Sequence, residues 1–303
     1  MTNTRYAPDR GLTRRMSVTM FLLGLLYVVF VAVLIALGVR AISVLVVAAC
    51  LLLVQFFLSD KIALFAMHGR LVSPQEAPEL HGVIDRLSAM ANMPKPRVAI
   101  ADSDVPNAFA TGRNQKNAVV CVTTGLLRRL SREELEGVLS HEMSHVAHRD
   151  VAVMTIASFL GIVAGLMTRF ALYAGLGGRG RDDRGGIPIG LIIVVVSALV
   201  YAISFLLTRA LSRYRELAAD RAGALLTQRP SALASALTKV SGDIARIPTR
   251  DLREAEPFNA FYFAPALSGV RARSSLAGLL ATHPPLERRL EQLSRISAEL
   301  GRG

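Results

Sequence analysis

Residues 131–150, "SREELEGVLSHEMSHVAHRD", carry the strongest local signals in this chain. Ser131 and Glu134 stand in the register of a capping box, which predicts that a helix begins at this point. Apolar residues then recur at helical intervals on one stripe, namely Leu135, Val138, Leu139 and Val146. The stretch therefore predicts one helix that holds every histidine in it.

Two of these histidines, His141 and His145, lie one helical turn apart. Their β-carbons would be about 5 to 6 Å apart, so both imidazoles can bind a single metal ion. Glu142 is displaced around the helix, where it can reach a water molecule at the ion without coordinating the ion itself. In H-E-x-x-H zinc hydrolases, two histidines hold the ion and the glutamate takes the proton from water. His148 would lie about 10 Å along the helix from His141, too far to share the ion, which indicates a surface or supporting role.

A catalytic zinc ion has three protein ligands and one open position, so a third ligand must come from elsewhere. A metzincin would place another histidine soon after the second one, and "HVAHRDVAVM" offers none in that register. The best supplier is "RYRELAAD", in which Glu216 and Asp220 are one helical turn apart. One carboxylate can bind zinc while the other holds a ligand histidine through its remaining ring nitrogen. The alternative is an exposed helix face on which both acids pair with Arg213 and Arg215.

Four apolar runs contain no charged side chain and approach the roughly 20 residues that cross a bilayer as a helix. The first run is longer than the apolar core of a secretory signal. We therefore predict two helical hairpins in a membrane, formed by residues 17–37 and 42–58 and by residues 151–168 and 187–207.

The basic residues predict how these hairpins are oriented. Four arginines precede the first run, only Arg40 lies in its turn, and Lys61 and Arg70 follow the second run, which places the soluble segments in the cytoplasm. The arginine-rich loop before residue 187 is more positive than a translocated loop prefers, so full crossing by the second hairpin is left open. His145 precedes the third run and Glu216 follows the fourth, so an even number of crossings returns both to one side of the membrane.

The net charge of +12 raises the question of a nucleic-acid partner. Much of the excess lies beside the apolar runs, where anionic lipid accounts for it, and no nucleic-acid-binding pattern is present. We expect the lipid bilayer and polypeptides as partners, and no nucleic acid. The two cysteines, Cys50 and Cys121, provide no disulfide framework, which is typical of a reducing compartment.

The remaining soluble sequence predicts a mainly α fold with a small β-sheet. A helix is expected within residues 73–93, short strands in "RVAIA", "NAFAT" and "AVVCVT", irregular chain from about residue 241, and an amphipathic helix in "HPPLERRLEQLSRISAEL". We expect four parts. A helical membrane anchor is made of two hairpins, residues 1–59 and 151–208. A zincin-like HExxH metallopeptidase domain is made of two pieces, residues 60–150 and 209–303.

Five blocks of the chain resemble the HtpX family, bacterial membrane zinc peptidases of the gluzincin type related to the CAAX prenyl proteases. The blocks are "NAFATG" at 107–112, "VTTGLL" at 122–127, "HEMSHVAHRD" at 141–150, "SRYRELAAD" at 212–220 and "THPPLERRL" at 282–290. The resemblance implies one Zn²⁺ per chain bound by His141, His145 and Glu216, with Glu142 as general base and Asp220 supporting a ligand histidine.

The same resemblance implies roles for two further blocks. Residues Asn107, Ala108, Phe109 and Ala110 would lie at a sheet edge that takes the substrate as an added strand, although Phe109 also suits core packing. His283 would lie near the cleft as a catalytic residue with Arg289 beside it, and either could stabilise the oxyanion. The alternative for this pair is a loop histidine and a solvated arginine.

These features predict a zinc endopeptidase of the cytoplasmic membrane that cleaves misfolded or damaged membrane proteins on the cytoplasmic side. A prenyl-protein protease is a second reading, although it usually needs more membrane spans. An inactive zinc-binding membrane scaffold is a third, although structural zinc normally has four protein ligands.

Overall fold

A computed structural model describes the chain at residues 6, 9–36, 41–150, 153–154, 157, 189–246 and 283–301. The chain divides into two units. One contains Met1–Leu12, Leu58–Ala152 and Ser212–Gly303, and the other contains Thr13–Phe57 and Val153–Leu211. Each unit is therefore assembled from segments that are far apart in the sequence.

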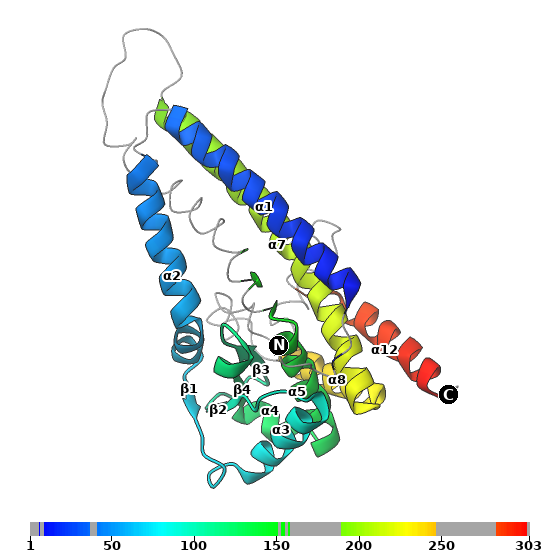
Figure 1. Cartoon of the computed structure of the whole chain (residues 1–303). Coiled ribbons are helices and arrows are strands. Elements are labelled where there is room, and N and C mark those ends of the chain that lie inside the picture. Colours follow the sequence, from blue (N-terminus) through cyan, green and yellow to red (C-terminus); the bar gives the residue numbers. More distant parts are fainter. Residues whose placement is uncertain are drawn as a thin grey trace. The chain divides into compact units, whose positions relative to one another are not determined.

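Three long helices account for three of the four predicted apolar runs: α1 (Arg10–Ala36), α2 (Ala41–Ala66) and α7 (Ile189–Thr227). Of these, α1 and the Leu191–Thr227 part of α7 are identified as long and apolar enough to cross a membrane. Apolar side chains of α1, including Phe30, pack with Val200 of α7. The two helices run side by side in Figure 1. The turn at 37–40 and most of the run at 151–168 lie outside the described residues.

The four-stranded sheet has the order β1-β2-β4-β3. Its strands are β1 (Gly69–Leu71), β2 (Arg97–Ala101), β3 (Ala108–Thr111) and β4 (Val119–Thr123). Strand β2 is parallel to β4, while β1 and β3 pair antiparallel to β2 and β4 respectively. Strand β3 is therefore an edge strand, as the sequence predicts for the substrate segment.

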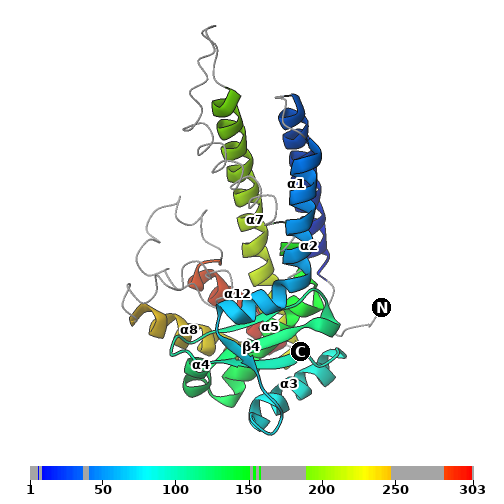
Figure 2. The same cartoon turned by 90° about the vertical axis from the view of Figure 1, so that its left-hand side faces the viewer.

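Both faces of this sheet are covered. One face carries Val98, Val120 and Val122, whose side chains belong to the main core. Helices α3 (Pro78–Ala91) and α5 (Arg132–Ala147) also contribute to this core, and both lie in the lower part of Figure 2. On the other face, Ala63 at the end of α2 packs against Phe109 and Cys121. The side chain of Phe109 therefore belongs to the core, which was the alternative reading for this residue.

Helix α5 forms as its capping box predicts, with Ser131 and Glu134 bonded reciprocally. It differs from a surface helix with one buried stripe, because every residue from Glu134 to Val146 is buried. The helix contacts the sheet on one side and α8 (Pro230–Arg246) on another, where the backbone at Leu233 approaches Gly137. Glu134 and Glu136 are buried as ion pairs with Lys239 and Arg86.

The remaining elements are a 3₁₀ turn (Gln115–Asn117), α4 (Thr124–Arg129) and α12 (Leu286–Leu300), which packs on α8 (Figure 1). Helix α12 begins directly after Pro284 and Pro285, as expected. The expectation of irregular chain from about residue 241 is wrong up to Arg246, where α8 ends. Residues 247–282 lie outside the described part of the chain.

Candidate metal centre

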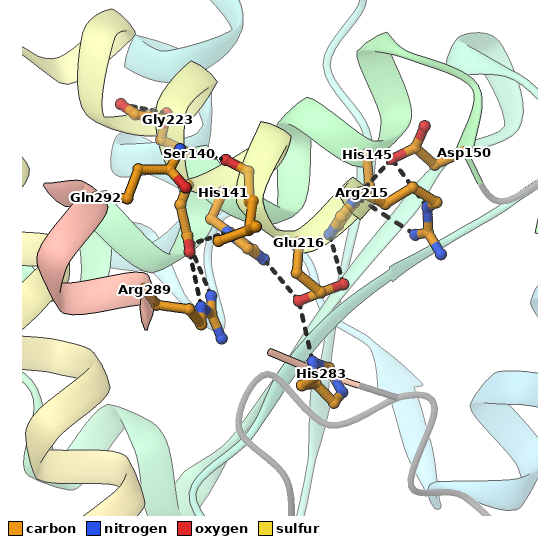
Figure 3. Close-up of polar contacts among 12 residues, drawn as sticks. Ser140, His141, His145, Asp150, Arg215, Glu216, Gly223, His283, Arg289 and Gln292 are labelled. Atoms are coloured by element: carbon orange, nitrogen blue, oxygen red, sulfur yellow. Dashed lines mark hydrogen bonds and ion pairs between the residues drawn. The ribbon is translucent and has the colours of Figure 1, made fainter. Parts of the chain in front are cut away.

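Three buried side chains from two helices converge on one point (Figure 3). Nε2 of His141 lies 3.5 Å from Oε2 of Glu216, and Nε2 of His145 lies 3.6 Å from Oε1 of the same carboxylate. Two atoms that each bind one zinc ion at about 2.1 Å in tetrahedral geometry lie about 3.4 Å apart. The separations of these donors, and their two-imidazole, one-carboxylate chemistry, therefore fit a zinc ion.

The second ring nitrogen of His141 faces a buried carboxylate. Nδ1 of His141 lies 2.9 Å from Oδ1 of Asp220, which comes from α7 one turn after Glu216. Arg289 of α12 donates to this carboxylate through Nε and Nη2, each at 2.7 Å. Both Asp220 and Arg289 are almost completely buried, so Arg289 is not the solvated side chain of the alternative reading.

His145 has a corresponding partner that the sequence analysis did not identify. Its Nδ1 is hydrogen-bonded to Oδ2 of Asp150 at 2.8 Å, and Nε of Arg215 lies 3.1 Å from the same oxygen. Arg149, with a left-handed φ of 58°, turns the chain after α5 and brings Asp150 back to the histidine. Arg215 therefore pairs with Asp150, and the exposed pairing surface considered for Glu216 and Asp220 is wrong because both acids are buried.

Glu142 lies next to the three donors and points to the edge strand. Its Oε2 accepts a hydrogen bond of 3.1 Å from the backbone N–H of Ala110. Burial raises the pKa of Glu142 to about 7, against the opposing effect of the neighbouring His141. A carboxylate with this pKa is suited to accept and return a proton near neutral pH.

Burial and neighbouring charges shift the pKa values of the three donor side chains. Burial alone would lower the pKa of His141, but the Asp220 and Glu216 carboxylates outweigh it and raise the pKa to about 9. Burial and the nearby Arg215 lower the pKa of His145. Burial opposes ionisation of Glu216, yet His283 and His141 hold its pKa well below the usual range. Metal binding requires loss of the His141 proton, because a ligand imidazole must be neutral at the coordinating nitrogen.

His283, just before α12, completes the polar cluster. Its Nδ1 lies 3.0 Å from Oε2 of Glu216, and its buried Nε2 has no hydrogen-bond partner among the described residues. His148 is separate from the three-donor group and bonds the carbonyl of Ser144 at the end of α5. The structure thus brings together seven of the predicted side chains: His141, Glu142, His145, Glu216, Asp220, His283 and Arg289.

The predicted substrate segment, Asn107 to Ala110, lies beside Glu142 at the sheet edge. Thr123 N donates to Asn107 O at 2.9 Å, which pairs Asn107 with β4. Hydrogen-bonding direction alternates along an antiparallel strand, so the main-chain groups of Ala108 and Ala110 face away from β4. The side chains of Asn107, Ala108 and Phe109 are buried, so these three residues can offer a peptide only their backbone.

Comparisons with known proteins agree with this geometry. The model of "Peptidase family M48" matches residues 74–297. Protease HtpX homolog 1 of Streptomyces coelicolor is 64% identical over 298 residues, covering 98% of this chain and 97% of the relative. Protease HtpX homolog of Moorella thermoacetica is 52% identical, covering 96% of each chain.

A solved structure, that of S. mikatae Ste24p, shares the fold. It superposes with a TM-score of 0.54 at 18% sequence identity, covering 94% of this chain and 67% of the other. The two apolar helices and the family matches together identify a membrane metalloprotease. This chain belongs to peptidase family M48 and, within it, to the HtpX proteases.

Proposed function

We propose that the protein is a zinc-dependent endopeptidase in which His141, His145 and Glu216 hold one Zn²⁺ per chain. The observation that carries this proposal is the convergence of the three buried donors beside Glu142. Bound zinc would polarise the scissile carbonyl and make the attacking water more acidic. Cys121 lies in the core of the sheet and outside the donor group, which favours a three-ligand catalytic site over a four-ligand structural one.

The surrounding side chains prepare the two histidines for this role. Asp220 and Asp150 each face the Nδ1 atom of one histidine, so an Nδ1–H on each ring points to a carboxylate. This tautomer leaves the Nε2 lone pairs directed toward Glu216 and the metal position. Glu142 then accepts the proton of the attacking water and delivers it to the leaving amine.

The substrate peptide lies along β3 in this proposal. The main-chain groups of Ala108 and the carbonyl of Ala110 hold it as an added strand, while the Ala110 N–H remains bonded to Glu142. Such main-chain pairing accepts many sequences. Arg289 directs Nε and Nη2 at Asp220, which favours His283 over Arg289 as the group that stabilises the oxyanion. Nε2 of His283, which has no hydrogen-bond partner among the described residues, is the atom that would donate that hydrogen bond.

We also propose a physiological role, for which the family membership and the charge pattern are the support. We assign the protein to the cytoplasmic membrane as a multi-pass protein, with its catalytic site facing the cytoplasm and misfolded or damaged membrane proteins as substrates. The names of the HtpX relatives, the apolar helices and the arginines around the first hairpin support this assignment. The four-part organisation with boundaries after residues 59, 150 and 208 is part of the same proposal.

Glu142→Gln tests the proposed chemistry. The variant keeps the shape of the side chain and loses the base, so we expect the metal content of the wild type and a fall in casein cleavage of roughly 10²- to 10⁴-fold. Glu133→Gln, on the exposed side of the first turn of α5, is the matched control and should cleave normally. If Glu142→Gln cleaves casein as fast as the control, Glu142 is not the base.

A further inference from the structure

We propose that Tyr6, which precedes the first apolar helix, is a positioning residue that fixes the metal-binding helix α5 beside His141. The inference rests on the proposed metal site. Tyr6 lies outside the family match, which begins at residue 74. It nevertheless belongs to the same structural unit as the metal centre, because Met1–Leu12 is grouped with Leu58–Ala152 and Ser212–Gly303.

The contacts of Tyr6 converge on the residue next to a metal ligand. Its hydroxyl donates to the carbonyl oxygen of Ser140 at 2.8 Å and lies 3.2 Å from the Ser140 hydroxyl. Only 3% of the Tyr6 surface is exposed. Burial raises the pKa of Tyr6 well above its usual range, so the phenol keeps the proton that it donates.

Ser140 lies at a close approach of the two helices that carry the donors. Its hydroxyl donates to the carbonyl oxygen of Gly223 on α7 at 3.3 Å (Figure 3). A β-carbon on Gly223 would stand 3.0 Å from the backbone nitrogen of His141, so only glycine allows this approach without a shift. Tyr6, Ser140 and Gly223 therefore link the amino-terminal segment, α5 and α7 at one point.

Tyr6 contacts α5 at a second point, near the end of the helix. Its ring centroid lies 6.3 Å from that of His148, which is the C-cap residue. Contacts at Ser140 and His148 are two turns apart, so they oppose rotation of α5 about its own axis. Such rotation would move Nε2 of His141 and His145 relative to Glu216, and metal sites tolerate deviations of only about 0.2 Å in ligand distance.

The segment also continues directly into the first apolar helix. Oδ1 of Asp9, three residues after Tyr6, accepts a hydrogen bond from Leu12 N at 2.8 Å and caps the start of α1. The point where α1 begins is thus tied, through Tyr6, to the metal-binding helix. This connection explains why a residue so far from the H-E-x-x-H motif can influence it.

Full-length Tyr6→Phe tests the role, since it keeps the buried ring and its contact with His148 and removes only the hydroxyl. We expect the zinc dissociation constant, measured by chelator competition, to rise by roughly twofold to tenfold. The visible absorption spectrum of the Co²⁺-substituted protein should change, and kcat should fall with KM unchanged. Tyr201→Phe is the matched control, because it removes an exposed hydroxyl from α7.

Wild-type affinity and an unchanged Co²⁺ spectrum in Tyr6→Phe would overturn the proposal, even if its thermal midpoint fell, because the hydroxyl would then be only structural. That result leaves the proposed metal site intact. Absence of metal binding by the wild-type protein would instead overturn both proposals together.

Discussion

Two aspartates hold the two proposed ligand histidines in matched ways. Asp220 faces Nδ1 of His141 and is paired with Arg289, while Asp150 faces Nδ1 of His145 and is paired with Arg215. Each arginine offsets the cost of burying its carboxylate, and it holds the pKa of that carboxyl below the usual range despite burial. The imidazoles therefore remain oriented even before a metal ion binds.

Asp220→Asn should weaken metal binding by about 10- to 100-fold, the usual effect of losing a partner of a ligand histidine. It should also destabilise the fold by about 3 to 5 kcal/mol, because Arg289 would keep a buried charge without its carboxylate. Chelator competition and thermal unfolding measure the two effects. Asp243→Asn, which breaks a partly exposed pair with Arg129, is the control. Equal metal affinity in the two variants would contradict the proposed role of Asp220.

Helices α5 and α7 carry the three proposed metal donors, and their backbones approach each other closely. Gly223 permits this approach, since its missing side chain leaves room for the backbone of His141 and Ser140. Backbone atoms cannot move aside as the end of a flexible side chain can. The distance between the two helices, and with it the geometry of the three donors, therefore depends on one glycine.

Gly223→Ala should force the two helices apart by a few tenths of an ångström, which costs about 1 to 3 kcal/mol of stability as overpacking and lowers metal affinity. Gly82→Ala on α3 is the matched control, because a β-carbon there meets nothing within 4 Å. That change should instead stabilise the protein by about 0.4 to 1 kcal/mol through better helix propensity. Thermal midpoints that shift in the same direction for both variants would contradict this account of the helix contact.

Local sequence signals predict the elements that have caps and regular periodicity. The capping box of α5, the strands β2 to β4 and the prolines before α12 are all present. Strand β1 was missed because three residues show no pattern, and it exists only through its pairing with β2. Helix α8 was missed although Leu233, Leu237, Val240 and Ile244 lie at helical intervals and are all buried.

Some residues of the candidate site can be predicted from the sequence and others cannot, depending on whether local spacing or the folded backbone brings them together. His141, Glu142 and His145 follow from spacing on one helix, and Glu216 from its carboxylate pair and the family resemblance. Asp150 and Arg215 could not be paired from the sequence, because the contact depends on the left-handed turn at Arg149. A lone acid directly before an apolar run was the only available signal for Asp150.

The peptidase unit as a whole is discontinuous in the sequence. His141 and His145 come from the segment before the second pair of apolar runs, whereas Glu216, His283 and Arg289 come from the segment after it. The three-donor group can therefore form only after the segment that carries Glu216 has been made. Glu216 joins the two segments, because its carboxylate lies within reach of both histidines and of His283.

Metal content per chain in the full-length wild type and in Glu216→Ala tests the proposed site most directly. We predict one zinc ion per wild-type chain, and in Glu216→Ala a loss of affinity beyond the about 100-fold expected from losing a supporting partner alone. Glu291→Ala, on the exposed face of α12, should bind metal as the wild type does. A Glu216→Ala protein that retains one tightly bound ion per chain would contradict the account of how this chain holds its metal.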